Sequence, residues 1–163
     1  MHHQCDCSRR FRVVIGRASD YKRAKKLLWV GNHPTYVGPN MLKRHARNGG
    51  LLIFQVDDKD AAVAVVNPRL NVILVLNVHP NHRGHGLGSA IMRFLRPSWV
   101  RSISEFVQWF ERQGYVVVSD PKQGRRYETR LMVRQELLTL AGRIAKLYEE
   151  TLKEKQTDGT QGA

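Results

Sequence analysis

The chain alternates short apolar runs with polar connections that contain glycine, which is the pattern of a sheet-forming domain. Three runs stand out, at Leu51–Phe54, Ala61–Val66 and Val72–Leu76. Each has the length of a strand and is far shorter than the roughly 20 apolar residues of a membrane span. The same criterion predicts six strands: Phe11–Ile15, Leu51–Val56, Ala61–Val66, Val72–Val78, Trp99–Ile103 and Tyr115–Ser119.

Two of these strands are predicted to form a hairpin. Leu51–Val56 and Ala61–Val66 flank the acidic segment Asp57-Asp58-Lys59-Asp60, which reads as a loop of four residues. The nearly continuous apolar run of Val72–Val78 predicts a central strand with both faces covered.

Helical periodicity and end signals predict five helices. Ser19 or Asp20 can cap the first, Asn40 the second, and Ser104 the fourth. The last helix carries two neighbouring apolar stripes, and so wide an apolar face has to pack on the domain or on a second copy. The five predicted helices are Tyr21–Val30, Met41–Arg47, Ser89–Leu95, Glu105–Gln113 and Arg130–Lys155.

This order of elements predicts an α/β fold with a mixed, mostly antiparallel central sheet flanked by helices. At 163 residues the chain suits one domain. We expect residues 11–155 to form it, with 130–155 as an extra C-terminal helix. Residues 1–10 are expected to be flexible, and 156–163 to be a disordered tail. With no leader recognised at the start, the expected location is cytoplasmic.

A glycine loop between a strand and a helix is the most informative motif. The strand Val72–Val78 runs through His79-Pro80-Asn81-His82 into Arg83-Gly84-His85-Gly86-Leu87-Gly88. Free amides of such a loop and of the next helical turn attract anions, phosphate above all. A P-loop requires Lys after the last glycine, and Ser89 stands there. A dinucleotide fingerprint requires a different glycine spacing and an acidic residue about 20 residues on, so both readings are poor.

The loop resembles the acyl-CoA signature of the GNAT N-acyltransferase superfamily, through Arg83, Gly86 and Gly88. The phrase Phe106–Tyr115, an aromatic-rich helix end before a last strand, is also similar to that superfamily, and the resemblance covers roughly residues 11–118. It implies the GNAT fold, acetyl-CoA as the cofactor, and a fourth strand that splays from the fifth. The resemblance further implies that Leu76, Asn77 and Val78 bind the pantetheine arm of CoA. It also implies that the pyrophosphate of CoA is bound by the loop residues Arg83, Gly84, His85, Gly86, Leu87, Gly88 and Ser89.

The residues that transfer protons depart from the family pattern. Many relatives have a tyrosine as the acid for the thiolate, where this chain has Phe110, and no carboxylate lies between Leu70 and Pro80. Titration near neutrality or a phenol proton makes three residues candidates for catalysis: His33, Tyr36 and His79. His82 and His85 are expected to touch phosphate. No metal site is predicted, because the only cysteines, Cys5 and Cys7, have no second ligand pair.

The net charge of +13 and a pI of about 10.4 indicate a polyanionic partner such as tRNA or DNA. A merely solvated face is the plainer alternative. Basic residues concentrate in three stretches: Arg9, Arg10, Arg12 and Arg17; Lys22, Arg23, Lys25 and Lys26; Lys122, Arg125, Arg126, Arg130 and Arg134.

Three hypotheses of function follow. The first is an acyl-CoA-dependent N-acetyltransferase whose acceptor amine is on an aminoacyl-tRNA, a ribosomal protein or another protein. The second is nucleobase modification, because the His33–Tyr36 loop loosely resembles phage Mom-type proteins that modify adenine in DNA. The third is a non-catalytic nucleic-acid-binding module on the same scaffold. A homodimer through the C-terminal helix is compatible with all three.

Overall fold

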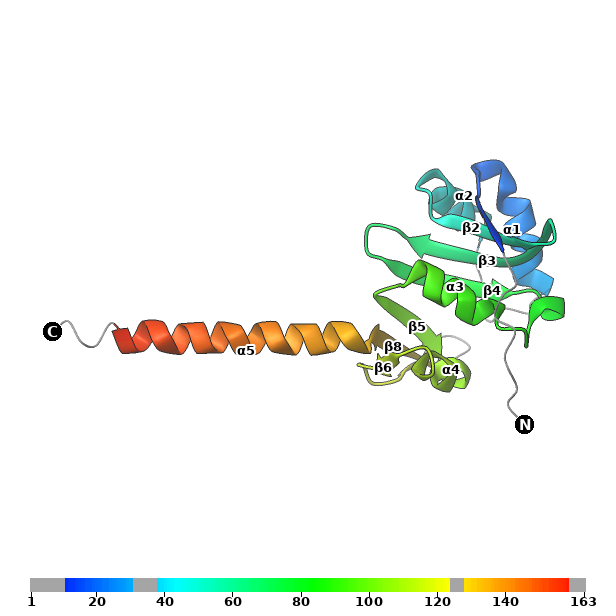
Figure 1. Ribbon diagram of the computed structural model, residues 1–163. Coiled ribbons are helices and arrows are strands. Elements are labelled where there is room, and N and C mark those ends of the chain that lie inside the picture. The colour runs from blue at the N-terminus through cyan, green and yellow to red at the C-terminus, as the bar shows by residue number, and fades with distance from the viewer. Residues whose placement is uncertain (1–10, 31–37, 124–127, 159–163) are drawn as a thin grey trace, which may run out of the picture.

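The computed structural model describes residues 11–30, 38–123 and 128–158, the last eleven of these by their backbone alone. In this part of the chain one sheet runs in the order β1-β2-β3-β4-β5-β8-β6, with the short β7 beside β8 (Figure 1). All neighbouring strands are antiparallel except β4 and β5, which are parallel. The strands are β1 Arg12–Ile15, β2 Leu51–Val56, β3 Lys59–Asn67, β4 Val72–Val78, β5 Trp99–Ile103, β6 Tyr115–Val117, β7 Lys122–Gln123 and β8 Glu128–Arg134.

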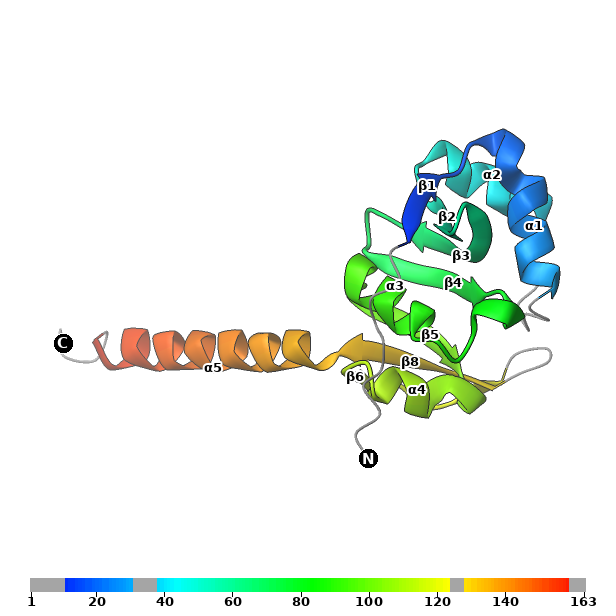
Figure 2. The same cartoon turned by 45° about the vertical axis from the view of Figure 1, so that its right-hand side comes forward.

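Helices cover both faces of the sheet, which confirms the predicted fold class (Figure 2). The helices are α1 Tyr21–Val30, α2 Pro39–Arg47, α3 Leu87–Leu95, α4 Val107–Glu111 and α5 Gln135–Asp158. Successive strand residues point to opposite faces. Ile53, Val63 and Val65 therefore pack against α1 and α2, while Phe54 and Ala62 pack against α3. A third cluster joins Met92 of α3 to the β5, β6 and β8 half of the sheet.

The β2–β3 hairpin has a tighter turn than predicted. Only Asp57 and Asp58 connect the strands, with φ values of 50° and 58°. Two successive residues with positive φ make a two-residue hairpin turn whose twist matches the strands it joins. β3 consequently begins at Lys59, and the predicted four-residue loop is wrong.

β4 is central, as predicted, but its two faces are not both covered. The β3–β4 register passes from Val65 opposite Val75 to Val66 opposite Ile73, so Leu74 is an extra residue in β4. Such a bulge bends the strand and strengthens its twist. Leu74 is 36% exposed in consequence, and the expectation of full coverage fails there.

The largest correction concerns the start of the C-terminal helix. Residues 130–134 were predicted to be helical, but they belong to β8, which pairs with β5 on one side and β6 on the other. Met132 is fully buried in this strand. The helix begins at Gln135 and continues to Asp158, so residues 156–158 are helical rather than part of a disordered tail.

Other boundaries differ by a few residues. α3 begins at Leu87 rather than Ser89, because Gly86 already serves as its N-cap. α2 begins at Pro39, with Gly38 rather than Asn40 as the N-cap. The predicted helix Glu105–Gln113 divides into a 3₁₀ turn, Ser104–Phe106, and α4. β6 ends at Val117 instead of Ser119.

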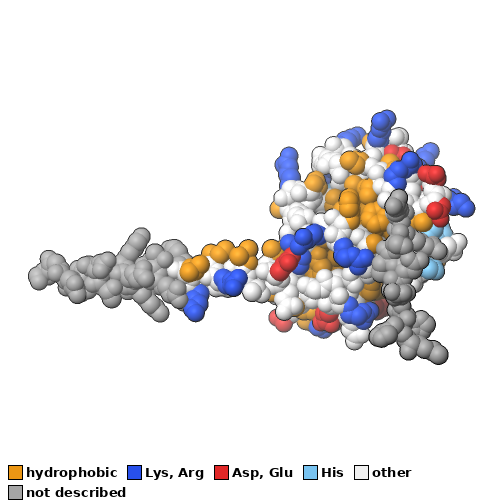
Figure 3. Space-filling view, in the orientation of Figure 1, with side chains coloured by type: hydrophobic (Ala, Val, Ile, Leu, Met, Phe, Trp, Pro, Cys, Tyr) orange, Lys and Arg blue, Asp and Glu red, His pale blue; other side chains and the backbone are white. Residues whose placement is uncertain are grey.

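α5 projects from the domain as a single straight helix (Figure 1). It packs mainly against β8, at its own start. Apolar side chains of the described part of α5 lie at the surface along one side of the helix (Figure 3). Four of them are between 43% and 63% exposed: Leu138, Leu140, Ile144 and Leu147. None of the described helices is long and apolar enough to cross a membrane.

We predict that Gly50→Ala destabilises the fold by about 2–4 kcal/mol. A Cβ at Gly50 would run into the carbonyl oxygen of Val66, and the backbone there is fixed by hydrogen bonds from Gly50 N–H to His45 and from Val66 N–H to Gly50. Gly142→Ala is the control: it has open space in the middle of α5 and should gain about 1 kcal/mol. Urea unfolding measures both. Equal stability of the two variants would contradict the prediction.

Candidate functional site

The sheet opens between its two parallel strands. Within the described residues, β4 pairs with β5 only at Val72–Trp99 and Ile73–Val100, and no described strand pairs with the rest of β4 on that side. Antiparallel ladders alternate the direction of their backbone groups. Because the His79 N–H donates to Ala61, the backbone groups of Leu76 and Val78 point away from β3, into the opening.

The glycine loop follows at the wide end of this opening. Gly84 and Gly86 have φ values of 75° and 77°, a conformation that favours glycine. Gly86 is the N-cap of α3, and its carbonyl accepts from Ala90 N–H at 2.9 Å. The amides of the first turn have no hydrogen-bond acceptor among the described residues; they are Leu87, Gly88 and Ser89. With the positive end of the helix dipole beside them, these amides can bind an anion.

Arg83 bends back from the loop toward the end of β4. Its Nε donates to the carbonyl oxygen of Val78 at 2.8 Å, and its Nη2 to Oδ1 of Asn77 at 3.3 Å. Asn77 is buried and donates from Nδ2 to the carbonyl oxygen of Leu27 in α1, at 2.8 Å. Arg83 thus contacts two of the three strand residues predicted to hold the pantetheine arm, Asn77 and Val78, and its predicted role at the pyrophosphate stays a prediction.

Trp109 of α4 is a neighbour of the loop that the sequence did not single out as a site residue. A Cβ built on Gly88 would lie 3.2 Å from Cζ2 of Trp109 and 3.7 Å from Cγ2 of Val78. Gly88 lets α3 pack closely on Val78 of β4. In the structure it makes room for the indole ring as well, so any larger residue at position 88 would push against Trp109.

Of the three predicted catalytic residues, only His79 is in the described part of the chain. It follows β4 directly, and its Nδ1 accepts a hydrogen bond from the Asn81 N–H at 3.2 Å. Its ring centroid lies 6.0 Å from that of His82. His33 and Tyr36 lie outside the described residues, as do Cys5 and Cys7. His85 is exposed on the loop beside Gly86.

Phe110 lies in the third core cluster, where the family pattern led us to look for a tyrosine acid. Its ring packs edge-on against Trp109 and Tyr115, with centroids 4.8 Å and 6.1 Å away. Two buried hydroxyl groups in this half of the sheet already donate hydrogen bonds to backbone carbonyl oxygens. Tyr115 donates to the carbonyl oxygen of Pro97 at 2.6 Å, and Ser102 donates to that of Ile103 at 2.8 Å. Burial raises the pKa of Tyr115 to about 12, which makes it a poor acid.

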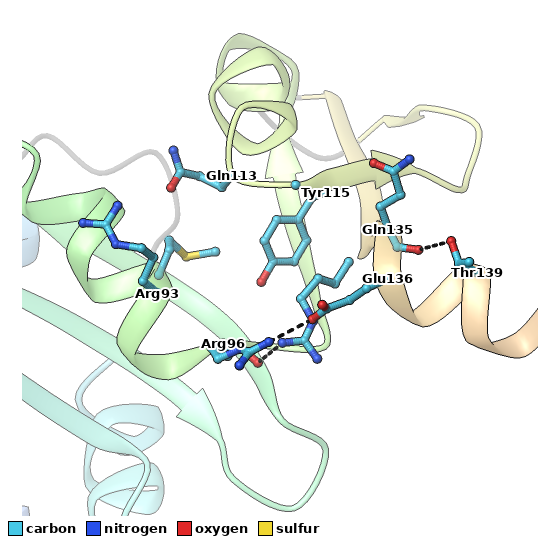
Figure 4. Close-up of a pocket in the computed structure, with 10 residues that line it drawn as sticks. Arg93, Arg96, Gln113, Tyr115, Gln135, Glu136 and Thr139 are labelled. Atoms are coloured by element: carbon cyan, nitrogen blue, oxygen red, sulfur yellow. Dashed lines mark hydrogen bonds and ion pairs between the residues drawn. The ribbon is translucent and has the colours of Figure 1, made fainter.

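A cavity of about 690 Å³ lies at the other end of α3 (Figure 4). It is bounded by the C-terminal end of α3, the start of β6 and the root of α5. Its charged groups are largely paired, because Glu136 holds Arg96 at 3.2 Å and Arg134 at 2.8 Å. This cavity is next to the closed end of the β4–β5 pair and is separate from the glycine loop. Nowhere in the described residues do three or more His, Cys, Asp or Glu gather as metal ligands.

No protein-family model and no curated protein sequence matches the chain. Solved structures do match it. The loading GNATL domain of CurA from Lyngbya majuscula has a TM-score of 0.61 at 12% identity, over 78% of this chain and 98% of that chain. The ribosomal-protein-S18-alanine N-acetyltransferase from Escherichia coli has 0.58 at 17%, over 76% and 92%. Arabidopsis thaliana Naa50, in complex with the bisubstrate analogue CoA-Ac-MVNAL, has 0.60 at 12%, over 75% and 96%.

The chain therefore has the fold of the GNAT acetyltransferases, as the resemblance of its motifs implied. Each neighbour is covered almost entirely, while roughly a quarter of this chain lies outside the match. That share is close to α5 and the two ends of the chain taken together.

We predict that the stability advantage of the wild type over Tyr115→Phe shrinks as the pH rises from about 10 to 12. The folded-state pKa of about 12 lies above the ordinary 10.0, so the buried neutral phenol contributes stability below pH 10 that is lost as it ionises. At neutral pH the variant should lose about 1 kcal/mol with the hydrogen bond to Pro97. Denaturant unfolding across this range is the measurement, and a constant difference would contradict the prediction.

Proposed function

We propose that the protein is an acyl-CoA-dependent N-acetyltransferase that moves an acetyl group from acetyl-CoA to an amine. One observation carries the proposal: an unpaired strand edge, Leu76–Val78, leads directly to a helix start with unused amides, Leu87–Ser89. The edge offers backbone groups to an extended amide-containing arm, and the helix start offers donors to its diphosphate. The fold shared with Naa50, which was solved with a CoA-containing analogue, supports the same reading.

Acetyl-CoA supplies an activated thioester, and the chain has to position it beside the amine. In the reaction a C–N bond forms, the C–S bond breaks, and one amine proton ends on the thiolate sulfur or in solvent. For an arm that lies along this edge, the backbone N–H groups of Leu76 and Val78 are donors that can stabilise the charge developing on the carbonyl oxygen. Phe110 cannot donate a proton, so His33, Tyr36 and His79 stay the predicted candidates for proton transfer.

We further propose that the acceptor amine is carried by a partner bound to nucleic acid, or by an aminoacyl-tRNA, in the cytoplasm. The support is the net charge of +13, which acetyl-CoA binding by itself does not require. One structural neighbour is an acetyltransferase of a ribosomal protein, according to its name. The competing hypotheses are nucleobase modification and nucleic-acid binding without catalysis. An assay of CoA release with tRNA or ribosomal fractions distinguishes them from N-acetyl transfer.

Gly86→Ala should weaken acetyl-CoA binding at least tenfold, because it strains the backbone that presents the α3 amides. The matched control is Gly49→Ala: Gly49 also has positive φ, 69°, and has no heavy atom within 4 Å of an added Cβ. Both variants should lose about 1–2 kcal/mol of stability, but only Gly86→Ala should lose affinity. Isothermal titration calorimetry measures the affinity, and assays of CoA release with tRNA or ribosomal fractions follow turnover. No binding by the wild type at tens of micromolar would refute the proposal.

We also propose that α5 pairs with α5 of a second copy. A projecting helix with Leu138, Leu140, Ile144 and Leu147 exposed gains most when another apolar helix face covers it. The residues Leu137, Leu140, Ile144 and Leu147 recur at the alternating spacing of three and four that a two-helix coiled coil uses.

Ile144→Glu should therefore shift the protein to a monomer in sedimentation equilibrium, because a charge would enter the paired seam. Thr139→Glu makes the same change of charge on the polar side of α5 and should leave the dimer intact. A wild type that stays monomeric at high concentration would contradict the pairing, without bearing on acetyl-CoA binding.

A further inference from the structure

The outer face of α1 combines three lysines with an exposed tryptophan. Lys22, Lys25 and Lys26 are exposed, and Trp29 is 78% exposed, the highest value among the large apolar side chains. Spacings of three, four and seven residues put them along one side of the helix. The other side is buried through Ala24, Leu27 and Leu28. This lysine–tryptophan face is thus fixed in direction by the core beneath it.

Among the described residues, the acidic groups beside this face are bound by Arg23 rather than by the three lysines, although Lys26 also helps to lower the pKa of Asp60. Asp20 and Asp60 are both bound by Arg23, at 3.1 Å and 2.7 Å, and the pairing with Arg23 lowers the pKa of Asp60. None of the ion pairs among the described residues includes Lys22, Lys25 or Lys26. The lysine charges therefore remain available to an anionic ligand.

Trp29 adds a flat aromatic surface to the end of this charged row. No aromatic pair in the described part of the chain involves its ring. Bases of a single strand stack on exposed aromatic rings while lysines follow the phosphates, whereas a duplex keeps its bases stacked on each other. A ligand that presents phosphates and accessible bases together suits both halves of this face.

The tryptophan end of the face lies next to the opening in the sheet. Asn77 near the end of β4 donates to the carbonyl oxygen of Leu27, two residues before Trp29. The same Asn77 accepts from Arg83 of the glycine loop. Figures 1 and 2 both show the C-terminal end of α1 beside the end of β4. A strand lying along α1 therefore has one end close to the candidate acetyl-transfer site.

We propose that the lysine–tryptophan face of α1 binds single-stranded nucleic acid, with a base stacked on Trp29 and phosphates on Lys22, Lys25 and Lys26. This deepens the proposed function, on which its catalytic meaning rests, because it holds a nucleic-acid-borne acceptor at the mouth of the split. The binding itself requires no acetyl-CoA and is tested without it.

Fluorescence anisotropy with labelled oligonucleotides tests the face. The probes are a single-stranded RNA, a DNA of the same sequence, and the corresponding duplex. Trp29→Ala should weaken single-strand binding about tenfold, as the loss of one stacked base implies, and Trp29→Phe should restore most of it. Better binding of RNA or of DNA identifies the strand. A preference for the duplex, or equal binding by the wild type and Trp29→Ala, would overturn the proposal.

The salt dependence tests the lysines separately. Three phosphate contacts on a single strand predict a contribution of about −2 to the slope of log K against log salt. Lys25→Gln with Lys26→Gln should make the slope shallower by more than one. Lys59→Gln, at an exposed lysine that begins β3, is the control and should change the slope by less than the double variant does. An unchanged slope in the double variant would overturn the role of α1.

Calorimetry with acetyl-CoA separates this inference from the proposed function. Trp29→Ala should bind acetyl-CoA as the wild type does, because its ring lies outside the strand edge and the α3 amides. If the wild type does not bind acetyl-CoA, the proposed transferase function is refuted, but the proposal that α1 binds nucleic acid is not affected. If the wild type does not bind the oligonucleotides, the proposal for α1 is refuted, but acetyl-CoA binding and the proposed transferase function are not affected.

Discussion

The short parallel contact between β4 and β5 is the constraint on which this structure depends. Two residue positions hold the halves of the sheet together, and beyond them β4 keeps one edge unpaired. An unpaired edge in the middle of a sheet is costly unless something satisfies its backbone groups. Hydrophobic packing offsets this cost, because the third cluster, around Met92 and Met132, packs α3 against the β5–β8 half of the sheet.

Asn77 connects the parts that surround this opening. It belongs to β4, its amide nitrogen holds α1, and its amide oxygen accepts from Arg83. A buried amide that uses both ends in this way fixes three segments relative to each other. The strand edge, the glycine loop and the end of α1 therefore form one unit, although Asn77 and Leu27 alone lie 50 residues apart in sequence.

Local chemistry explains what the sequence predicted well. Val72–Val78 and Tyr21–Val30 were predicted with the bounds that the structure has, because their periodicity and end signals are local. Glycine spacing also predicted a loop between β4 and α3, although α3 begins two residues earlier than expected. β8 was missed because Leu131 also fits the apolar stripe of the following helix, and the segment becomes a strand through its pairing with β5 and β6. Motif spacing likewise identifies Arg83 as a site residue but does not predict that its side chain turns back to Val78. The contact between Trp109 and Gly88 depends on the tertiary fold, so the sequence did not predict it.

The bond from Arg83 to the carbonyl oxygen of Val78 has a consequence for how this edge accepts a guest. An arriving N–H that takes this oxygen displaces a guanidinium group, and one donor replaces another at little net cost. The displaced cation stays tethered beside the glycine turn, where a negatively charged guest would meet it. Occupation of the edge and a gain of positive potential at the turn then happen together, so an anionic guest strengthens its own attraction to the turn as it binds the edge.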